Sequence, residues 1–63
     1  MKDFRDKVVV VTGAGSGMGR ELAVKLAQQG AKLAISDVDP DGLATTEKLV
    51  AEAGAPVHAQ ILN

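Results

Sequence analysis

The stretch that decides the fold runs from Val8 to Arg20 and has the sequence VVVVTGAGSGMGR. Its four consecutive valines are typical of a parallel β-strand covered on both faces, because a strand with one solvated face alternates apolar and polar residues. Glycines end this strand, and a helical period begins at Met18. A helix that starts directly after such a loop offers unpaired amides and the positive end of its dipole, which together bind phosphate groups.

The segment after the loop has the period of an amphipathic helix that ends before Gly30. Its predicted apolar face consists of Met18, Leu22, Ala23, Leu26 and Ala27, and its predicted polar face of Arg20, Glu21, Lys25 and Gln28.

The rest of the chain repeats the alternation of strand and helix. Residues 31–36 predict a second strand, and Asp39 followed by Pro40 forms an N-cap and first helical position. A second helix is expected over residues 41–53, with an apolar face at Leu43, Leu49, Val50 and Ala53, and a third strand over residues 57–62. Strands that alternate with helices in this way predict right-handed crossovers and a parallel sheet.

The fold class expected is therefore α/β: a Rossmann-type βαβαβ half, with a three-stranded parallel sheet in the order 3-2-1 and two helices. Residues 1–63 are interpreted as the N-terminal part of a dinucleotide-binding domain. The domain is expected to be incomplete, because no predicted element covers the free edge of the strand at residues 8–11.

The composition narrows the classes of function. The chain has 63 residues, a net charge of −1 and no cysteine, tryptophan or tyrosine. This charge argues against nucleic acid as a partner, and no apolar run has the length of a membrane span. No cluster of residues has metal-ligand spacing, and His58 is interpreted as an ordinary strand residue. A cytoplasmic location is expected.

The spacing of the glycines distinguishes between the known types of phosphate-binding loop. A P-loop needs glycine followed by Lys and then Ser or Thr, and the G-x-G-x-x-G pattern would need glycine in place of Met18 or Arg20. The pattern that fits is Thr12-Gly13-x-x-x-Gly17-x-Gly19. In this motif, and in the elements around it, the whole chain resembles the short-chain dehydrogenase/reductase family.

The resemblance implies a role for each residue of the motif. Gly13, Gly17 and Gly19 should form the turn, the close approach to the cofactor and the helix–sheet contact. Ser16 and Met18 should offer backbone amides, and Ser16 also its hydroxyl. The alternative is that the glycines only make a tight turn between strand and helix.

Asp37 indicates NAD in preference to NADP. In a Rossmann unit, an acid about 20 residues beyond the glycines accepts hydrogen bonds from the adenosine ribose, and its charge opposes a 2′-phosphate. The two positions where the family places a basic residue for NADP hold Ser16 and Val38. Val38 is expected to line the adenine pocket, and Asn63 stands where the family often has an Asp that contacts adenine. The alternative for Asp37 is a turn or capping role.

The family's catalytic Tyr-x-x-x-Lys pair has no counterpart here, because the chain contains no tyrosine. The chain by itself is therefore expected to catalyse no hydride transfer. The resemblance implies that the chain is the NAD-binding segment of a longer, homo-oligomeric oxidoreductase. The alternative is a stand-alone or engineered βαβαβ module that binds a nucleotide without catalysis.

Overall fold

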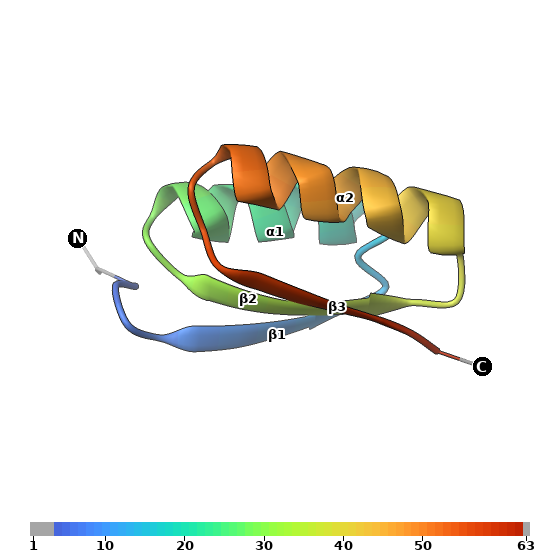
Figure 1. Cartoon of the computed structure of the whole chain (residues 1–63), viewed down its shortest axis with the longest axis horizontal. Coiled ribbons are helices and arrows are strands. Elements are labelled where there is room, and N and C mark those ends of the chain that lie inside the picture. The colour runs from blue at the N-terminus through green and yellow to red at the C-terminus, as the bar shows by residue number, and fades with distance from the viewer. Residues whose placement is uncertain (1–3, 63) are drawn as a thin grey trace.

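The computed structural model describes residues 4–62, which form three strands and two helices in the expected order (Figure 1). The elements are β1 (Val8–Thr12), α1 (Gly17–Gln28), β2 (Lys32–Asp37), α2 (Pro40–Glu52) and β3 (Val57–Ile61). Each bound lies within one residue of its prediction. Gly30 follows α1 as predicted, with φ of +94°, and Gly54 follows α2 in the same way, with φ of +90°.

The sheet is parallel, with β2 between β1 and β3, and this confirms the predicted order. Val8 pairs with Lys32 and Thr12 with Ser36, while Leu33 pairs with Val57. All three strands therefore end at the same edge of the sheet. The glycine loop and the turn into α2 leave from this edge, at the right-hand side of Figure 1.

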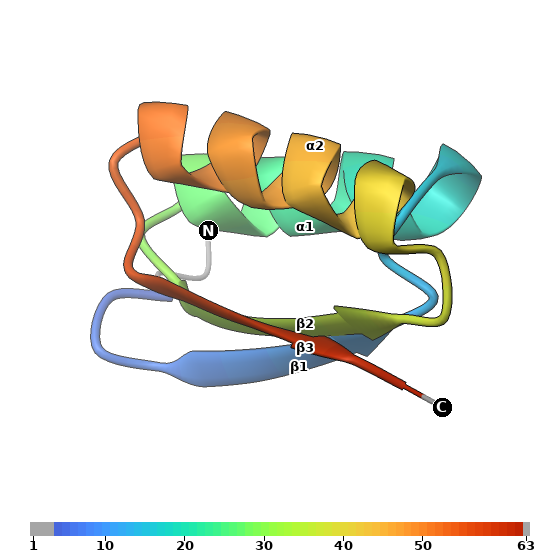
Figure 2. The ribbon, with the colours of Figure 1, turned by 45° about the vertical axis from the view of Figure 1, so that its right-hand side comes forward.

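Both helices lie on one face of the sheet, as the two views in Figures 1 and 2 show. Val11 points into the core, whereas Val10 is 69% exposed on the opposite face. The expectation that the valine strand is covered on both faces is therefore not met within residues 4–62. The reason is topological: crossovers of one hand that step in one direction across a sheet place their helices on the same face.

The core is built largely from small side chains. Its buried apolar residues are Val11, Ala14, Ala23, Ala27, Ala31, Leu33, Ile35, Leu43, Val50 and Ala55. Helix α1 contributes Ala23 and Ala27, and α2 contributes Leu43 and Val50. The predicted packing of Met18 and Leu22 is wrong, since Met18 is 86% exposed and Leu22 half-exposed. The narrow alanine stripe of α1 faces the sheet, and no element within residues 4–62 covers the flank that carries these two side chains.

The two faces of β1 predict opposite responses to isosteric substitutions in the 63-residue chain. Val11→Thr places a hydroxyl in the core and should lower the free energy of unfolding by about 1–3 kcal/mol. Val10→Thr places the same hydroxyl in water and should change that free energy by less than about 0.5 kcal/mol. Urea denaturation followed by circular dichroism measures both values. Equal losses would contradict the one-sided packing of β1.

Candidate functional site

The candidate site lies at the carboxyl edge of the sheet, where the loop between β1 and α1 meets the turn between β2 and α2. The two strand ends are held together there: the Ala14 amide donates a hydrogen bond of 3.0 Å to the Ser36 carbonyl. This contact extends the pairing of β1 with β2 into the loop. The loop residues therefore stand beside Asp37, the last residue of β2.

The predicted glycines meet two kinds of constraint. Gly13 and Gly17 have φ of +67° and +55°, in the left-handed region that glycine adopts without strain. Gly19 is required for close packing, because a Cβ there would collide with the Gly13 carbonyl. Its contact is thus with the loop itself, whereas the family resemblance implied contact between helix and sheet. The loop folds tightly back onto the first turn of α1.

The start of α1 has no cap of its own. Ser16 is the N-cap in an extended conformation, yet its hydroxyl makes no capping hydrogen bond, and the first turn contains no acidic residue. Helix α2 is different: Asp39 accepts a hydrogen bond from the Asp41 amide, and Asp41 adds a negative charge to the first turn. The first amides of any α-helix lack partners within the helix. At α1 they can bind an external acceptor, and an anion would suit the helix dipole.

Asp37 faces the loop and uses both of its carboxylate oxygens. Oδ2 accepts a hydrogen bond of 2.7 Å from the Gly15 amide, and Oδ1 accepts one of 3.0 Å from the Asp39 amide. The Asp39 amide, followed by the Gly15 amide, lowers the pKa of the Asp37 carboxyl below its ordinary value, so the group is ionised at neutral pH. An ionised carboxylate offers about four acceptor positions, so two bonds leave capacity for ligand hydroxyls.

Two residues predicted to contact the cofactor, Val38 through its side chain and Met18 through its amide, have exposed side chains beside this edge. Val38 follows Asp37 and is 68% exposed, and Met18 projects from the first turn of α1. The adenine contact predicted for Asn63 lies outside the described residues.

The contacts of two residues at the site, Arg20 and Thr46, were not predicted from the sequence. Arg20, expected on a solvated face, is half-buried, and its Nε donates a hydrogen bond of 2.9 Å to the Thr46 hydroxyl. Its Nη2 donates to the carbonyls of Gly15 (2.5 Å) and Gly42 (3.1 Å). Thr46 is fully buried, and its hydroxyl donates to the Ala14 carbonyl over 2.6 Å. One signal was available: Thr46 shares a helical face with Leu43 and Val50, where an apolar side chain is expected.

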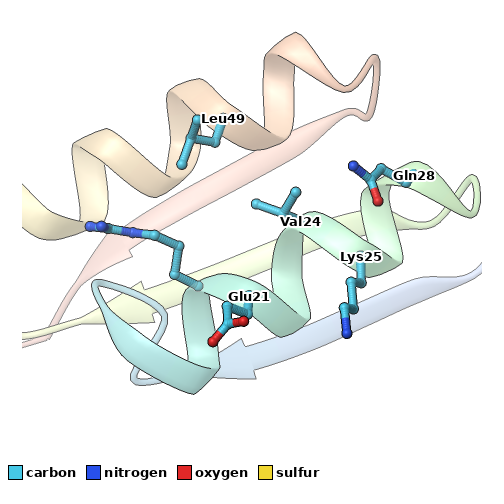
Figure 3. A pocket seen from close by; sticks show the side chains of 6 residues that line it. Glu21, Val24, Lys25, Gln28 and Leu49 are labelled. Atoms are coloured by element: carbon cyan, nitrogen blue, oxygen red, sulfur yellow. The ribbon is translucent and has the colours of Figure 1, made fainter.

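A separate groove lies between the two helices. Figure 3 shows Val24 of α1 and Leu49 of α2 facing one another across it. It has a volume of about 350 Å³, and Arg20, Glu21, Lys25 and Gln28 complete its lining. Within residues 4–62 no group of three acidic, His or Cys side chains could hold a metal ion. Neither described helix has the length and apolar character to cross a membrane.

Comparison with known proteins places these features in a family. A family model described as short chain dehydrogenase matches residues 7–63. The oxidoreductase SadH of Mycobacterium tuberculosis is 54% identical to this chain over its whole length. Levodione reductase of Leifsonia aquatica is 51% identical over 95% of the chain. The chain spans only 23% and 22% of the lengths of these two relatives.

A solved structure gives the same result. The short chain dehydrogenase/reductase of Burkholderia phymatum, in complex with NAD, superimposes on the whole chain with a TM-score of 0.90 at 46% identity. The chain covers 22% of that protein. The Rossmann-type half predicted from the sequence is thereby confirmed.

The contrast between the two helix starts predicts different effects of two alanine substitutions. Asp39→Ala removes the cap of α2 and should lower the free energy of unfolding by about 1 kcal/mol. Ser16→Ala removes a hydroxyl that caps nothing and should leave this free energy unchanged within about 0.5 kcal/mol. Urea denaturation of the two variants tests the difference. A loss for Ser16→Ala as large as that for Asp39→Ala would show that Ser16 does cap α1.

Proposed function

Because this chain belongs to the short-chain dehydrogenase family, we propose that it is the NAD(H)-binding N-terminal segment of an oxidoreductase. The intact protein would transfer hydride between the nicotinamide cofactor and an alcohol or carbonyl substrate. The observation that carries the proposal is the Asp37 carboxylate at the end of β2, bonded to a glycine loop that leads into an uncapped helix.

The residues present fit a dinucleotide at both ends of its adenosine diphosphate half. The amides of Ser16 and Met18, at the start of α1, would bind the pyrophosphate, with Gly13, Gly17 and Gly19 shaping the loop. The Asp37 carboxylate would accept hydrogen bonds from the ribose hydroxyls, and Val38 would line the adenine pocket. Asn63 is proposed as a further adenine contact. When bound, the cofactor supplies the hydride acceptor or donor.

The charge at Asp37 favours NAD over NADP. Its lowered pKa keeps the carboxyl ionised, so a 2′-phosphate on the ribose would meet a negative charge at short range. Ser16 and Val38 bring no positive charge to compensate for it. Several relatives of solved structure are described as bound to NAD, including the xylitol dehydrogenase that is 35% identical to this chain. Asp37 is thus the residue proposed to set the choice of cofactor.

Other properties of the intact protein stay predictions. The catalytic Tyr-x-x-x-Lys pair would lie in the part of the relatives' length that this chain does not span. Homo-oligomeric assembly and a cytoplasmic location are likewise predicted for the intact protein.

The choice of cofactor can be tested by nuclear magnetic resonance titration of the 63-residue chain with NAD and with NADP. The wild-type chain should prefer NAD by about tenfold, equivalent to about 1.4 kcal/mol. Asp37→Ala should bring the ratio of the two Kd values close to one, because the like-charge repulsion is lost. Glu52→Ala is the control: it removes an exposed acid at the far end of α2 and should preserve the preference. An unchanged preference in Asp37→Ala would remove Asp37 from the site.

A further inference from the structure

Thr46 and Arg20 fix two successive peptide units of the glycine loop. The unit between Ala14 and Gly15 is bonded at both ends, since its carbonyl accepts from the Thr46 hydroxyl and its amide donates to Asp37. The carbonyl of the next unit, on Gly15, accepts from Arg20. A planar trans peptide carries its C=O and N–H in opposite directions, so a bond that fixes the carbonyl also fixes the amide.

The amide fixed in this way by Arg20 belongs to Ser16. The Gly15 carbonyl is held toward Arg20, whose guanidinium also binds the Gly42 carbonyl in the first turn of α2. The Ser16 N–H is therefore directed to the opposite side, away from α2. Ser16 is itself exposed and stands at the uncapped start of α1.

Helix stability does not account for the charge of Arg20 at this place. Arg20 lies in the first turn of α1, and it contacts Gly42 in the first turn of α2. The start of α2 carries the negative charges of Asp39 and Asp41, but the first turn of α1 contains no acidic residue. The positive end of the α1 dipole therefore disfavours a cation at position 20. An anion bound at the loop would be attracted both by the positive end of the α1 dipole and by the Arg20 guanidinium.

We propose that Arg20 is a positioning residue for the pyrophosphate of the dinucleotide and that Thr46 holds it in place. Arg20 acts by directing the Ser16 amide toward the phosphate side of the loop. Lysine cannot replace it, because the arrangement uses two separate N–H groups, Nε toward Thr46 and Nη2 toward Gly15. This inference rests on the proposed function, since it concerns the same nucleotide site.

The test compares ADP, which carries the pyrophosphate, with adenosine, which lacks it. Both are titrated into the 63-residue chain and followed through its amide resonances. Arg20→Lys should weaken ADP binding by about tenfold, in line with the loss of hydrogen bonds to a charged group, and leave adenosine binding within about twofold. Thr46→Val should have the same selective effect, and Thr46→Ser, which keeps the hydroxyl, should restore ADP affinity.

Thr45→Val is the matched control. Thr45 is the exposed neighbour of Thr46, and its hydroxyl bonds only to the Asp41 carbonyl one turn earlier among the described contacts. The Thr45→Val variant should bind ADP and adenosine with the same affinities as the wild-type chain. If Arg20 and Thr46 had a purely structural role, their substitution would instead weaken the binding of ADP and of adenosine to the same extent.

The outcomes separate this inference from the proposed function. If the wild-type chain binds neither ADP nor NAD, the proposed function fails. If it binds ADP, and both Arg20→Lys and Thr46→Val keep the wild-type ratio of ADP to adenosine affinity, the positioning role alone is overturned. Should both variants unfold, hydrogen exchange at Arg20 Nε is compared between the wild-type chain with ADP and the wild-type chain with adenosine. Slower exchange with ADP than with adenosine supports the role, and equal exchange with the two ligands refutes it.

Discussion

The hydrogen bond from the Gly15 amide to the Asp37 carboxylate, 2.7 Å long, is the interaction on which the site depends. It joins the loop that leaves β1 to the residue that ends β2, and it exists because parallel strands bring both to one edge of the sheet. The bond also requires glycine at position 15, since a Cβ there would lie 2.7 Å from the Asp37 oxygen. The same contact shapes the loop and helps to keep the carboxylate ionised and turned toward it.

The buried residues of α1 have small side chains, and this affects how closely the helix packs. Ala23 and Ala27 are buried, and their small side chains let α1 lie close to the sheet. Helix α2 is stabilised at its own start by Asp39, whereas the start of α1 is not capped by Ser16. One helix start thus has a side-chain cap at this edge, and the other has none.

Local patterns were enough to predict the fold and the glycine loop at which the candidate site lies. The period of the apolar residues gave the strands and helices, and the spacing of Gly13, Gly17 and Gly19 gave the loop, because these features depend on neighbours in the chain. Arg20 and Thr46 make hydrogen bonds to partners that are 26 and 32 positions away in the sequence. The helical period marks Thr46 as a buried position, but no local pattern identifies these partners. The exposure of Met18 was missed for a related reason: a helical period shows that a face is apolar, but it does not show which part of that face another element covers.

The start of α1 and the end of β2 are together proposed to bind a dinucleotide. A crystal structure of the chain with NAD tests this proposal most directly. We expect the pyrophosphate within hydrogen-bond distance of the Ser16 and Met18 amides, and the adenosine ribose hydroxyls on the Asp37 carboxylate. A pyrophosphate bound away from these amides, or a ribose that makes no contact with Asp37, would contradict the account.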